Sequence, residues 1–356
     1  MLRYRCIAAS ALPAADRQVW HDILAQQADP LWHSPYFRPE FSEIVAQVRP
    51  DLQLALIYKE DQLQGFLPFH RLSAWRAEPL AGFLSDYHGP ILSDTARKNL
   101  DLSALLNAMC VRQFSYNHLP LDWAQASQAQ WRQTRSLLLD LSQGYQAYQA
   151  QLVAQRESGL LKKIATAKRK LAQKHGTVRF ELASSNAHDF VALLEGKSQQ
   201  YRRTVGAASD IFAQAWIREL MNLLFATSKP EFAGVLSCLY AGDKLIAAHF
   251  GLRSATTLHY WFPWYDTDYA EYSPGLIMLA ECAEAAAAQG WQRIDLGRGE
   301  QAYKQRFATS SIELAEGIWS RPACLGRLQS RLFLAKAELR ETALVKNVKA
   351  WRNKWR

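Results

Sequence analysis

A serine, a proline and a glycine before an apolar segment form the first motif with chemical potential, which is the binding of a phosphate group. Ser273-Pro274-Gly275 precedes a predicted helix over 276–288. Proline at the first helical turn loses no hydrogen bond, and glycine lets an anion approach the N–H groups at the positive end of the helix dipole. The motif predicts phosphate binding by Ser273, Gly275 and Leu276. The alternative is an ordinary helix start, because Ser-Pro openings are common.

A carboxylate, two glycines and a lysine form the second motif, and their chemistry is the stabilisation of charge during acyl transfer. Asp295 lies on a predicted strand over 291–296 that leads into Gly297-Arg298-Gly299. Open α/β sheets place their sites beyond the carboxyl ends of strands, so Asp295 has the position of a catalytic residue. Lys304 follows about two turns later and can neutralise an oxyanion. The alternative is a surface pair between Asp295 and a lysine or arginine.

Two further groups of polar residues each have a functional and a structural interpretation. His249, in the middle of a predicted strand over 245–252, is either a general base that deprotonates an acceptor or a hydrogen-bonded core histidine. Asp86, Tyr87 and His88 lie in a segment rich in glycine and proline, and they either line an acceptor cleft between two domains or form a plain turn.

Three larger side chains are candidates for contacts with substrate. Tyr201 and Arg202 end a predicted helix over 187–201, where they either meet an anionic acceptor or donor phosphate or complement the helix carboxyl terminus. Trp261 belongs to an aromatic stretch suited to a sugar or an acyl chain, and core packing is the alternative.

The elements that must position these residues alternate between helix and strand, which predicts a mixed or parallel sheet covered by helices. Gly176 and Gly290 are placed to terminate helices. The predicted helices are 15–28, 38–48, 96–115, 144–175, 187–201, 213–227 and 276–288, and the predicted strands are 52–58, 63–71, 119–123, 136–141, 177–182, 234–240, 245–252, 257–262, 291–296 and 312–319.

The charge of the chain is concentrated in two segments. The 356 residues, enough for two domains, have a net charge of +9. Residues 321–356 hold ten Lys and Arg against two acidic residues, and residues 156–179 hold eight against one. These segments have charges of +8 and +7, so the remaining body has a charge of 9 − 8 − 7 = −6. We therefore expect the basic segments to dock on partners and the chemistry to lie elsewhere.

The sequence lacks the signatures of several classes of protein. No stretch approaches the roughly 18 apolar residues of a membrane span, and the amino-terminal segment lacks the apolar core of a signal peptide. The five cysteines are widely spread without a Cys-x-x-Cys motif, the nine histidines are scattered, and neither a Gly-x-Ser-x-Gly elbow nor a phosphate-binding Gly-Lys-Ser/Thr loop occurs. We expect a cytoplasmic protein without a metal or a covalent nucleophile.

The order of the strand, the Ser-Pro-Gly helix, Asp-Leu-Gly-Arg-Gly and Tyr303-Lys304 resembles the FemAB-like, CelD-type branch of the GNAT acyltransferase superfamily. Segments 64–69 and 85–90 add to the resemblance, which covers about residues 15–320. It implies an α/β fold of two tandem GNAT-like (acyl-CoA N-acyltransferase) domains with mixed sheets, plus a basic C-terminal helix. The implied boundaries are an N-terminal domain over 1–143, a long basic connecting helix over 144–176, a donor-binding domain over 177–320 and a basic amphipathic tail over 321–356.

The resemblance also implies a reaction. An acyl group moves from an acyl-CoA thioester to an amine or hydroxyl of a sugar or an envelope or exopolysaccharide precursor, by direct attack in a ternary complex. Acyl-CoA is a co-substrate, and no cofactor is tightly bound. The family's aromatic-lysine pair matches Tyr303 and Lys304, so Lys304 is expected to stabilise the transition-state charge, with His249 or Asp295 as base or orienting group.

Donor binding is expected along the second domain. Its pyrophosphate would lie near Ser273–Leu276, with Arg298 and Gly299 beside it. The usual GNAT pyrophosphate loop has several glycines, whereas segment 269–275 has Gly275 alone.

Two alternatives stay open. Fem-type relatives use aminoacyl-tRNA as donor, and the basic segment 156–179 suits phosphate contacts with such a tRNA. A non-catalytic scaffold would instead dock its basic tail, with Trp351 and Trp355, on an acidic membrane at the inner face or on a protein partner.

Overall fold

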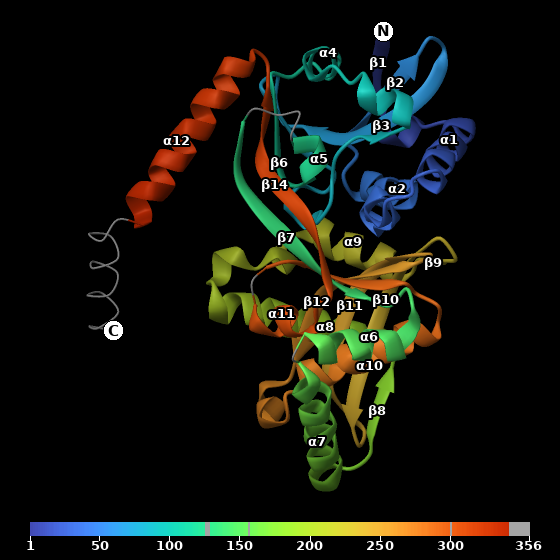
Figure 1. Cartoon of the computed structure of the whole chain (residues 1–356), viewed down its shortest axis with the longest axis vertical. Helices are drawn as coiled ribbons and strands as arrows, with labels where there is room; N and C mark the ends of the chain where they lie inside the picture. The colour runs from blue at the N-terminus through green and yellow to red at the C-terminus, as the bar shows by residue number, and fades with distance from the viewer. Residues whose placement is uncertain (125–128, 156, 300, 342–356) are drawn as a thin grey trace. The chain divides into compact units, whose positions relative to one another are not determined.

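Helices and strands alternate through most of the chain in the computed structural model, which describes residues 1–124, 129–155, 157–299 and 301–341 (Figure 1). The chain forms two compact units: Met1–Ile23, Asp51–Thr134 and Glu313–Arg356 make up the first, and Leu24–Pro50 and Arg135–Ile312 make up the second. Each unit therefore combines segments that are distant in the sequence. The domain boundaries inferred from the resemblance stay a prediction.

The first unit is a mixed sheet with short helices. Its strands follow the order β1-β2-β3-β4-β6-β14, antiparallel except for the parallel pair β4–β6. Trp20 stacks on Phe66 at 4.5 Å between ring centroids in its core. The elements are β1 (Leu2–Ala8), α1 (Ala14–Ala25), β2 (Leu52–Lys59), β3 (Gln62–Arg71), β4 (Arg76–Pro79), β5 (Ile91–Leu92), α3 (Asp94–Lys98), α4 (Leu102–Ala108), β6 (Gln113–Pro120), α5 (Leu121–Ala124), β14 (Ser310–Ser320) and α12 (Ala323–Glu341).

The second unit is a mixed sheet in the order β7-β13-β12-β11-β10-β8, with a parallel pair β12–β13 among antiparallel neighbours. The strands are β7 (Gln130–Asp140), β8 (Val178–Glu181), β9 (Ser228–Lys229), β10 (Phe232–Ala241), β11 (Lys244–Ser254), β12 (Thr257–Tyr265) and β13 (Arg293–Arg298). The helices are α2 (Pro39–Val48), α6 (Gly144–Ala154), α7 (Ser158–His175), α8 (Ala187–Thr204), α9 (Ala215–Phe225), α10 (Pro274–Ala288) and α11 (Ala302–Phe307).

Helices cover both faces of this second sheet. Phe250 of β11 packs on Phe190 of α8 and lies near Phe225 of α9. Its neighbour His249 stacks instead on Tyr260, which belongs to the core formed with α6, α7 and α10. Because successive strand side chains point to opposite faces, α8 and α9 lie on one face and α10 on the other. The expected α/β class with mixed sheets is confirmed.

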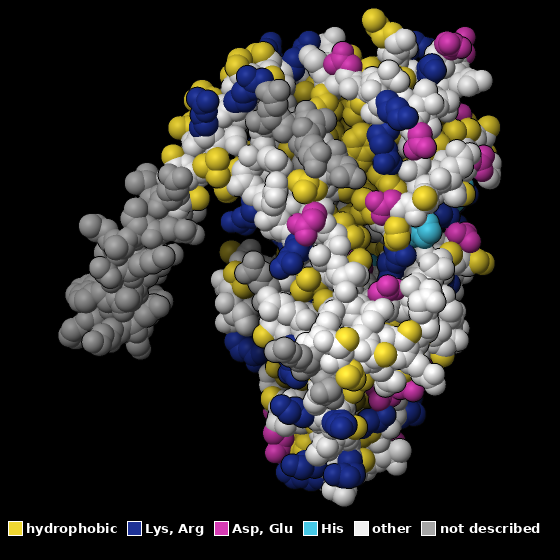
Figure 2. Space-filling view, in the orientation of Figure 1, with side chains coloured by type: hydrophobic (Ala, Val, Ile, Leu, Met, Phe, Trp, Pro, Cys, Tyr) yellow, Lys and Arg dark blue, Asp and Glu magenta, His cyan; other side chains and the backbone are white. Residues whose placement is uncertain are grey.

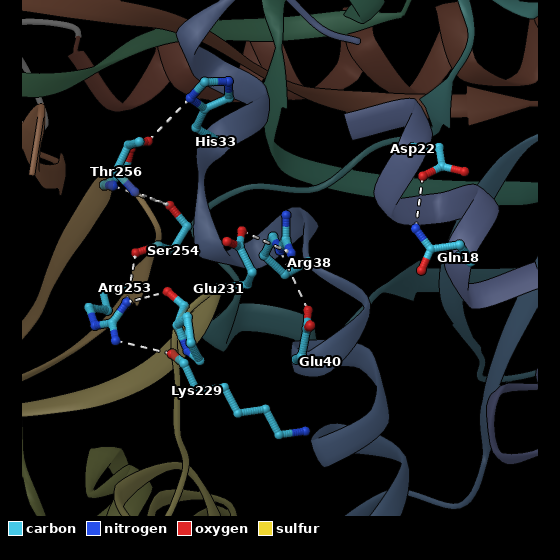
Figure 3. A network of polar contacts seen from close by, with 12 residues as sticks. Gln18, Asp22, His33, Arg38, Glu40, Lys229, Glu231, Arg253, Ser254 and Thr256 are labelled. Carbon is cyan, nitrogen blue, oxygen red and sulfur yellow. Dashed lines mark hydrogen bonds and ion pairs between the residues drawn. The ribbon is translucent and has the colours of Figure 1, made fainter. Parts of the chain in front are cut away.

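Segment 24–50 joins the second unit through polar contacts, which Figure 3 draws, and through aromatic contacts. Arg38 lies between Glu40 and Glu231, at 3.5 Å from each carboxylate, and His33 Nδ1 is 3.2 Å from Thr256 Oγ1. These bonds fix a pair of 3₁₀ turns, and the second of them places Tyr36 against His259 of β12.

Two predicted helices are broken in the structure. The segment predicted as one helix over 144–175 forms α6 and α7, because the Glu157 N–H bonds to the Leu152 carbonyl and its carboxylate pairs with Arg306 of α11. The segment predicted as a helix over 96–115 gives α3, α4 and the start of β6 instead, since Asp101 caps a new helix at Ser103 and Ala104.

The ends of several elements agree with prediction. Gly176 ends α7 with a φ of 90°, which a residue with a Cβ rarely adopts. The basic C-terminal helix is present as α12, while Trp351 and Trp355 lie outside the described residues. Within the described residues, none of the helices has the length and apolar character needed to cross a bilayer.

We expect Gly251→Ala to destabilise the second unit. A Cβ at this position would lie 2.1 Å from the His259 carbonyl oxygen and 2.7 Å from His249 Nε2, so the two strands must shift. Overpacking of this kind lowers the free energy of unfolding by about 1–3 kcal/mol, measured by urea denaturation.

Gly159→Ala is the matched control. Nothing lies within 4 Å of a Cβ added there, and the residue is in helix α7. The free energy of unfolding of this variant should therefore rise by about 0.5–1 kcal/mol. Equal urea midpoints for Gly251→Ala and the parent protein would contradict the close strand packing.

Candidate active site

Strands β12 and β13 begin as a parallel pair and then part. Their paired residues are Thr257 with Arg293, Leu258 with Ile294, and His259 with Asp295. Beyond that point β12 continues to Tyr265 and β13 to Arg298 without further pairing between them. Extended backbone has N–H and C=O groups that need partners, so this part of β12 offers an edge to an extended ligand.

Asp295 fixes the place where the two strands part. Its carboxylate is 2% exposed and accepts hydrogen bonds from Ser136 Oγ at 2.6 Å and from the Gly297 N–H at 2.8 Å. His259 Nδ1 lies 3.7 Å from the same carboxylate. Gly297 has a φ of 70°, and the pairing of β13 with β7 shifts register between Asp295 and Arg298. The carboxylate therefore holds an irregular strand end in a defined form.

His249 lies in the core on the α10 side of this strand pair. Its ring is fully buried and stacks on Tyr260 with 3.9 Å between centroids. Within the described chain, neither ring nitrogen of His249 nor the Tyr260 hydroxyl has a hydrogen-bond partner. Burial, with a contribution from His259, lowers the pKa of His249 well below its usual value. The base role of His249 stays a prediction, and the residue is neutral at pH 7.

A short helix, α11, places Tyr303 and Lys304 at the carboxyl end of β13. Lys304 Nζ donates to the carbonyl oxygens of Arg298, at 3.1 Å, and Gly297, at 3.5 Å. Tyr303 packs against the core, and burial raises the pKa of its phenol. Tyr148 of α6 donates to the Phe307 carbonyl at 2.9 Å and so holds the end of α11. The sequence analysis did not predict α11, because six residues are too few to show helical periodicity.

The amino terminus of α10 follows β12 through a 3₁₀ turn, Thr267–Tyr272. Ser273 is exposed in the left-handed region with a φ of 54°, and its side chain does not cap the helix. Pro274 is the first helical residue. A Cβ on Gly275 would have its nearest atom, Tyr265 Cδ1, at 3.5 Å. The positive end of a 15-residue helix, with Ser273 exposed and Pro274 buried, thus begins near Tyr265 at the end of β12.

This combination of parted parallel strands and a following helix terminus occurs in a segment that matches a known family. Residues 158–305 match the family described as acetyltransferase (GNAT) domain. This segment is therefore similar to that domain family. All of its residues belong to the second unit, and the elements β12, α10, β13 and α11 lie within this segment except for the last residues of α11.

Solved structures with the same fold cover nearly the whole chain. The C-terminal domain of a putative lysylphosphatidylglycerol synthetase from Agrobacterium fabrum aligns over 90% of this chain and 97% of its own, with 12% identity and a TM-score of 0.52. A tandem GNAT protein from the clavulanic acid biosynthesis pathway aligns over 90% and 98%, with 10% identity and a TM-score of 0.52.

FemX has the same architecture. It aligns over 84% of this chain and 94% of its own, with 8% identity and a TM-score of 0.51. No curated protein gives a significant match. The predicted tandem GNAT fold is therefore confirmed, and FemX shares this fold.

The other predicted contacts of the GNAT domain lie on α8, β12 and the end of β13. Arg202 forms a salt bridge with Asp210, with 2.8 Å between Nε and Oδ2. Trp261 lies edge-on to Tyr36 at 5.8 Å. Arg298 and Gly299 directly follow the irregular part of β13, and Gly299 has a φ of 144°.

Lys197 lies beside Tyr201 on α8, in the helix end that the sequence predicts either to meet an anionic acceptor or a donor phosphate or to complement the helix carboxyl terminus. Its ammonium is 5.2 Å from the Tyr201 ring centroid, and burial lowers its pKa to about 8.

Asp86, Tyr87 and His88 belong to the first unit, apart from the GNAT domain residues. His88 Nε2 accepts the backbone N–H groups of Asn117, at 3.2 Å, and His118, at 3.1 Å. Ser85 Oγ donates to the Tyr87 carbonyl at 2.6 Å, and Asp86 Oδ1 is 3.5 Å from His118 Nε2. These bonds hold the loop in place, and its contact with an acceptor stays a prediction.

We expect His249 to make the protein sensitive to acid. The unfolded chain takes up a proton near the ordinary histidine pKa of about 6.5, whereas the folded chain does not. Stability therefore falls as pH drops below that value, by up to about 1.4 kcal/mol per pH unit from this residue. Urea unfolding of His249→Leu between pH 7 and pH 5 should show a shallower loss of stability than the parent protein.

His188→Leu, at an exposed position on α8, is the control and should leave the pH slope unchanged. An identical slope for the parent and His249→Leu would show that His249 takes up its proton in the folded state.

Proposed function

We propose that this protein transfers an acyl group from an acyl-CoA thioester to an amine or hydroxyl of an acceptor. The main support is the end of the β12–β13 pairing at His259 and Asp295, with the exposed start of α10 after one strand and Tyr303 and Lys304 after the other. This arrangement matches the shape of the donor, which has an extended amide chain ending in a thioester at one end and a pyrophosphate at the other.

The donor would bind along β12. The amides of its pantetheine arm complete the hydrogen bonds of the β12 backbone between residues 260 and 265, as an added strand would. Its pyrophosphate meets the amino terminus of α10 at Ser273, Gly275 and Leu276, where the helix dipole favours negative charge. Arg298 and Gly299 approach from the end of β13. No covalent enzyme intermediate is required, because both substrates are bound together.

Lys304 and Tyr303 would perform the charge and proton steps. The acceptor nitrogen or oxygen attacks the thioester carbonyl, and the negative charge that forms on the carbonyl oxygen is stabilised by the Lys304 ammonium. The carbon–sulfur bond then breaks, and the Tyr303 hydroxyl gives its proton to the thiolate. Burial keeps that phenol protonated at neutral pH, as an acid requires.

The attacking amine or hydroxyl of the acceptor would release its proton toward Asp295. Asp295 contacts His259 and is held by Ser136, so it acts as base or orienting group, and His249 is the second candidate. Tyr201, Arg202 and Trp261 are the proposed acceptor contacts of the second unit. The proposed contact of Asp86, Tyr87 and His88 with an acceptor concerns the first unit by itself. A sugar or an envelope or exopolysaccharide precursor in the cytoplasm is the proposed acceptor class.

Transfer from aminoacyl-tRNA is the second candidate. It is supported by α7, which has six Lys and Arg and no acidic residue, and tRNA phosphates would contact that surface. The same α11 residues would then act on an ester instead of a thioester. A turnover assay with both donors separates the two functions.

Docking on an acidic membrane would add to either function. Helix α12 exposes Leu328, Leu332, Phe333 and Leu334 beside basic residues, which is the composition of an interfacial helix.

We predict that Gly275→Ala weakens donor binding without changing stability. Its Cβ would make an ordinary contact inside the protein but stand between the helix N–H groups and a phosphate. Calorimetric titration with acetyl-CoA should give a dissociation constant about tenfold higher than for the parent protein. Gly159→Ala serves as control, and unchanged affinity in Gly275→Ala would place the pyrophosphate elsewhere.

We also predict separate effects of the α11 residues on turnover. Lys304→Met should lower kcat about 10²-fold or more, and Tyr303→Phe about 10²-fold, with the KM for acyl-CoA nearly unchanged. The assay measures thiol release with a panel of amino sugars, and aminoacyl-tRNA replaces acyl-CoA in a parallel set. Lys59→Met, at an exposed position in the first unit, is the control. Full activity of Lys304→Met would remove the proposed oxyanion role.

A further inference from the structure

A basic pocket lies in the second unit, outside the parted strands. Its cavity of about 390 Å³ is lined by Lys162, Lys163, Thr166 and Lys170 of α7 and by Glu271 and Tyr272. Pockets of roughly 300–1,000 Å³ are typical of small-molecule sites. In Figure 2, Lys and Arg side chains gather at the lower end of the picture, where Figure 1 draws α7.

Helical spacing brings the basic residues to one side of α7. Lys162, Thr166 and Lys170 follow one another at intervals of four residues and so form one stripe. Lys163 lies beside this stripe, seven residues before Lys170. Three lysines therefore line one concave region, together with the acidic Glu271.

The other lysines of α7 that face carboxylates are already paired. Lys168 contacts Glu281 of α10 at 2.5 Å, and Lys174 contacts Glu271 at 3.4 Å. In the described part of the chain, Lys162, Lys163 and Lys170 have no such carboxylate partner. Like charges held together repel one another, and a bound anion relieves this repulsion.

The position of the pocket suggests what kind of anion. Tyr272, which lines the pocket, is directly followed by Ser273 and the exposed start of α10. Tyr272 is 6% exposed, and its ring contacts His175 and Lys174, so the lysines are the side chains available to a ligand. A small group with a compact double negative charge suits these cations.

We propose that this pocket binds a phosphate monoester, held by Lys162, Lys163 and Lys170. Two molecules could supply that group. One is the donor, since a CoA with its pyrophosphate at α10 has a ribose phosphate one sugar away. The other is a separate phosphorylated acceptor or effector. The site itself does not depend on the proposed transferase activity.

The first experiment uses adenosine 3′,5′-bisphosphate as probe in calorimetric titrations of the full chain. We expect the triple variant Lys162→Ala/Lys163→Ala/Lys170→Ala to bind it at least about tenfold more weakly than the parent protein. The matched control, Arg5→Ala/Lys59→Ala/Lys98→Ala, removes the same charge from exposed positions of the first unit and should bind within about twofold of the parent.

Urea unfolding of both variants checks that the fold is retained. We expect it to be retained in the pocket variant, because the three replaced lysines of α7 are exposed. Equal affinity of the parent and the pocket variant overturns the proposal, and so does a parent protein that does not bind the probe at millimolar concentration. An equal loss of affinity for the bisphosphate in both triple variants also overturns the proposal, because that result reflects net charge alone.

The second experiment distinguishes the sources by comparing CoA with dephospho-CoA, which lacks the ribose phosphate. If the parent prefers CoA by about tenfold and the pocket variant shows no preference, the donor supplies the phosphate. If CoA and dephospho-CoA bind the parent equally while the bisphosphate still requires the three lysines, a separate molecule supplies it. Failure of the parent to turn over any acyl-CoA counts against the proposed function and leaves the bisphosphate result standing.

Discussion

The hydrogen bonds to the Asp295 carboxylate are the constraint on which the candidate site depends. Ser136 and the Gly297 N–H hold this buried group where the pairing of β12 and β13 ends. A carboxylate with 2% exposure needs such partners, since an unpaired buried charge is costly. The same bonds fix the left-handed turn at Gly297 and thereby the direction in which β13 leaves the sheet. The unpaired edge of β12 follows from that departure.

The surrounding elements of the second unit support this local break. Helix α10 packs on β10 through β13 and exposes its positive end after β12, while α11 turns Lys304 back onto the last carbonyls of β13. Tyr148 and Glu157 join α11 to α6 and to the start of α7. A ligand bound along β12 would thus meet a helix dipole at one end and a lysine and a tyrosine at the other. The chemistry proposed for the protein rests on this arrangement.

Local sequence signals predicted the elements that depend on local interactions. The strands β10, β11 and β12, the Ser273-Pro274-Gly275 helix start and the terminating Gly176 were found from periodicity and backbone preference. The break between α6 and α7 depends on a bond between Glu157 and Arg306, and the parting of the strands depends on Ser136 reaching Asp295, 159 residues away. Contacts between residues so far apart leave no mark in the sequence near either one. Lys304 was identified from its spacing after Asp295 and the two glycines and Tyr303 from the family resemblance, while their helix was not predicted.

A crystal structure of the protein with an acyl-CoA thioether analogue that cannot be cleaved tests the proposed site most directly. We expect the pantetheine amides to bond to the backbone of β12 between residues 260 and 265, the pyrophosphate to lie at Gly275, and the sulfur to lie next to the Tyr303 hydroxyl. An analogue bound with its pyrophosphate away from α10, or with its sulfur remote from both Tyr303 and Lys304, would contradict the proposed site.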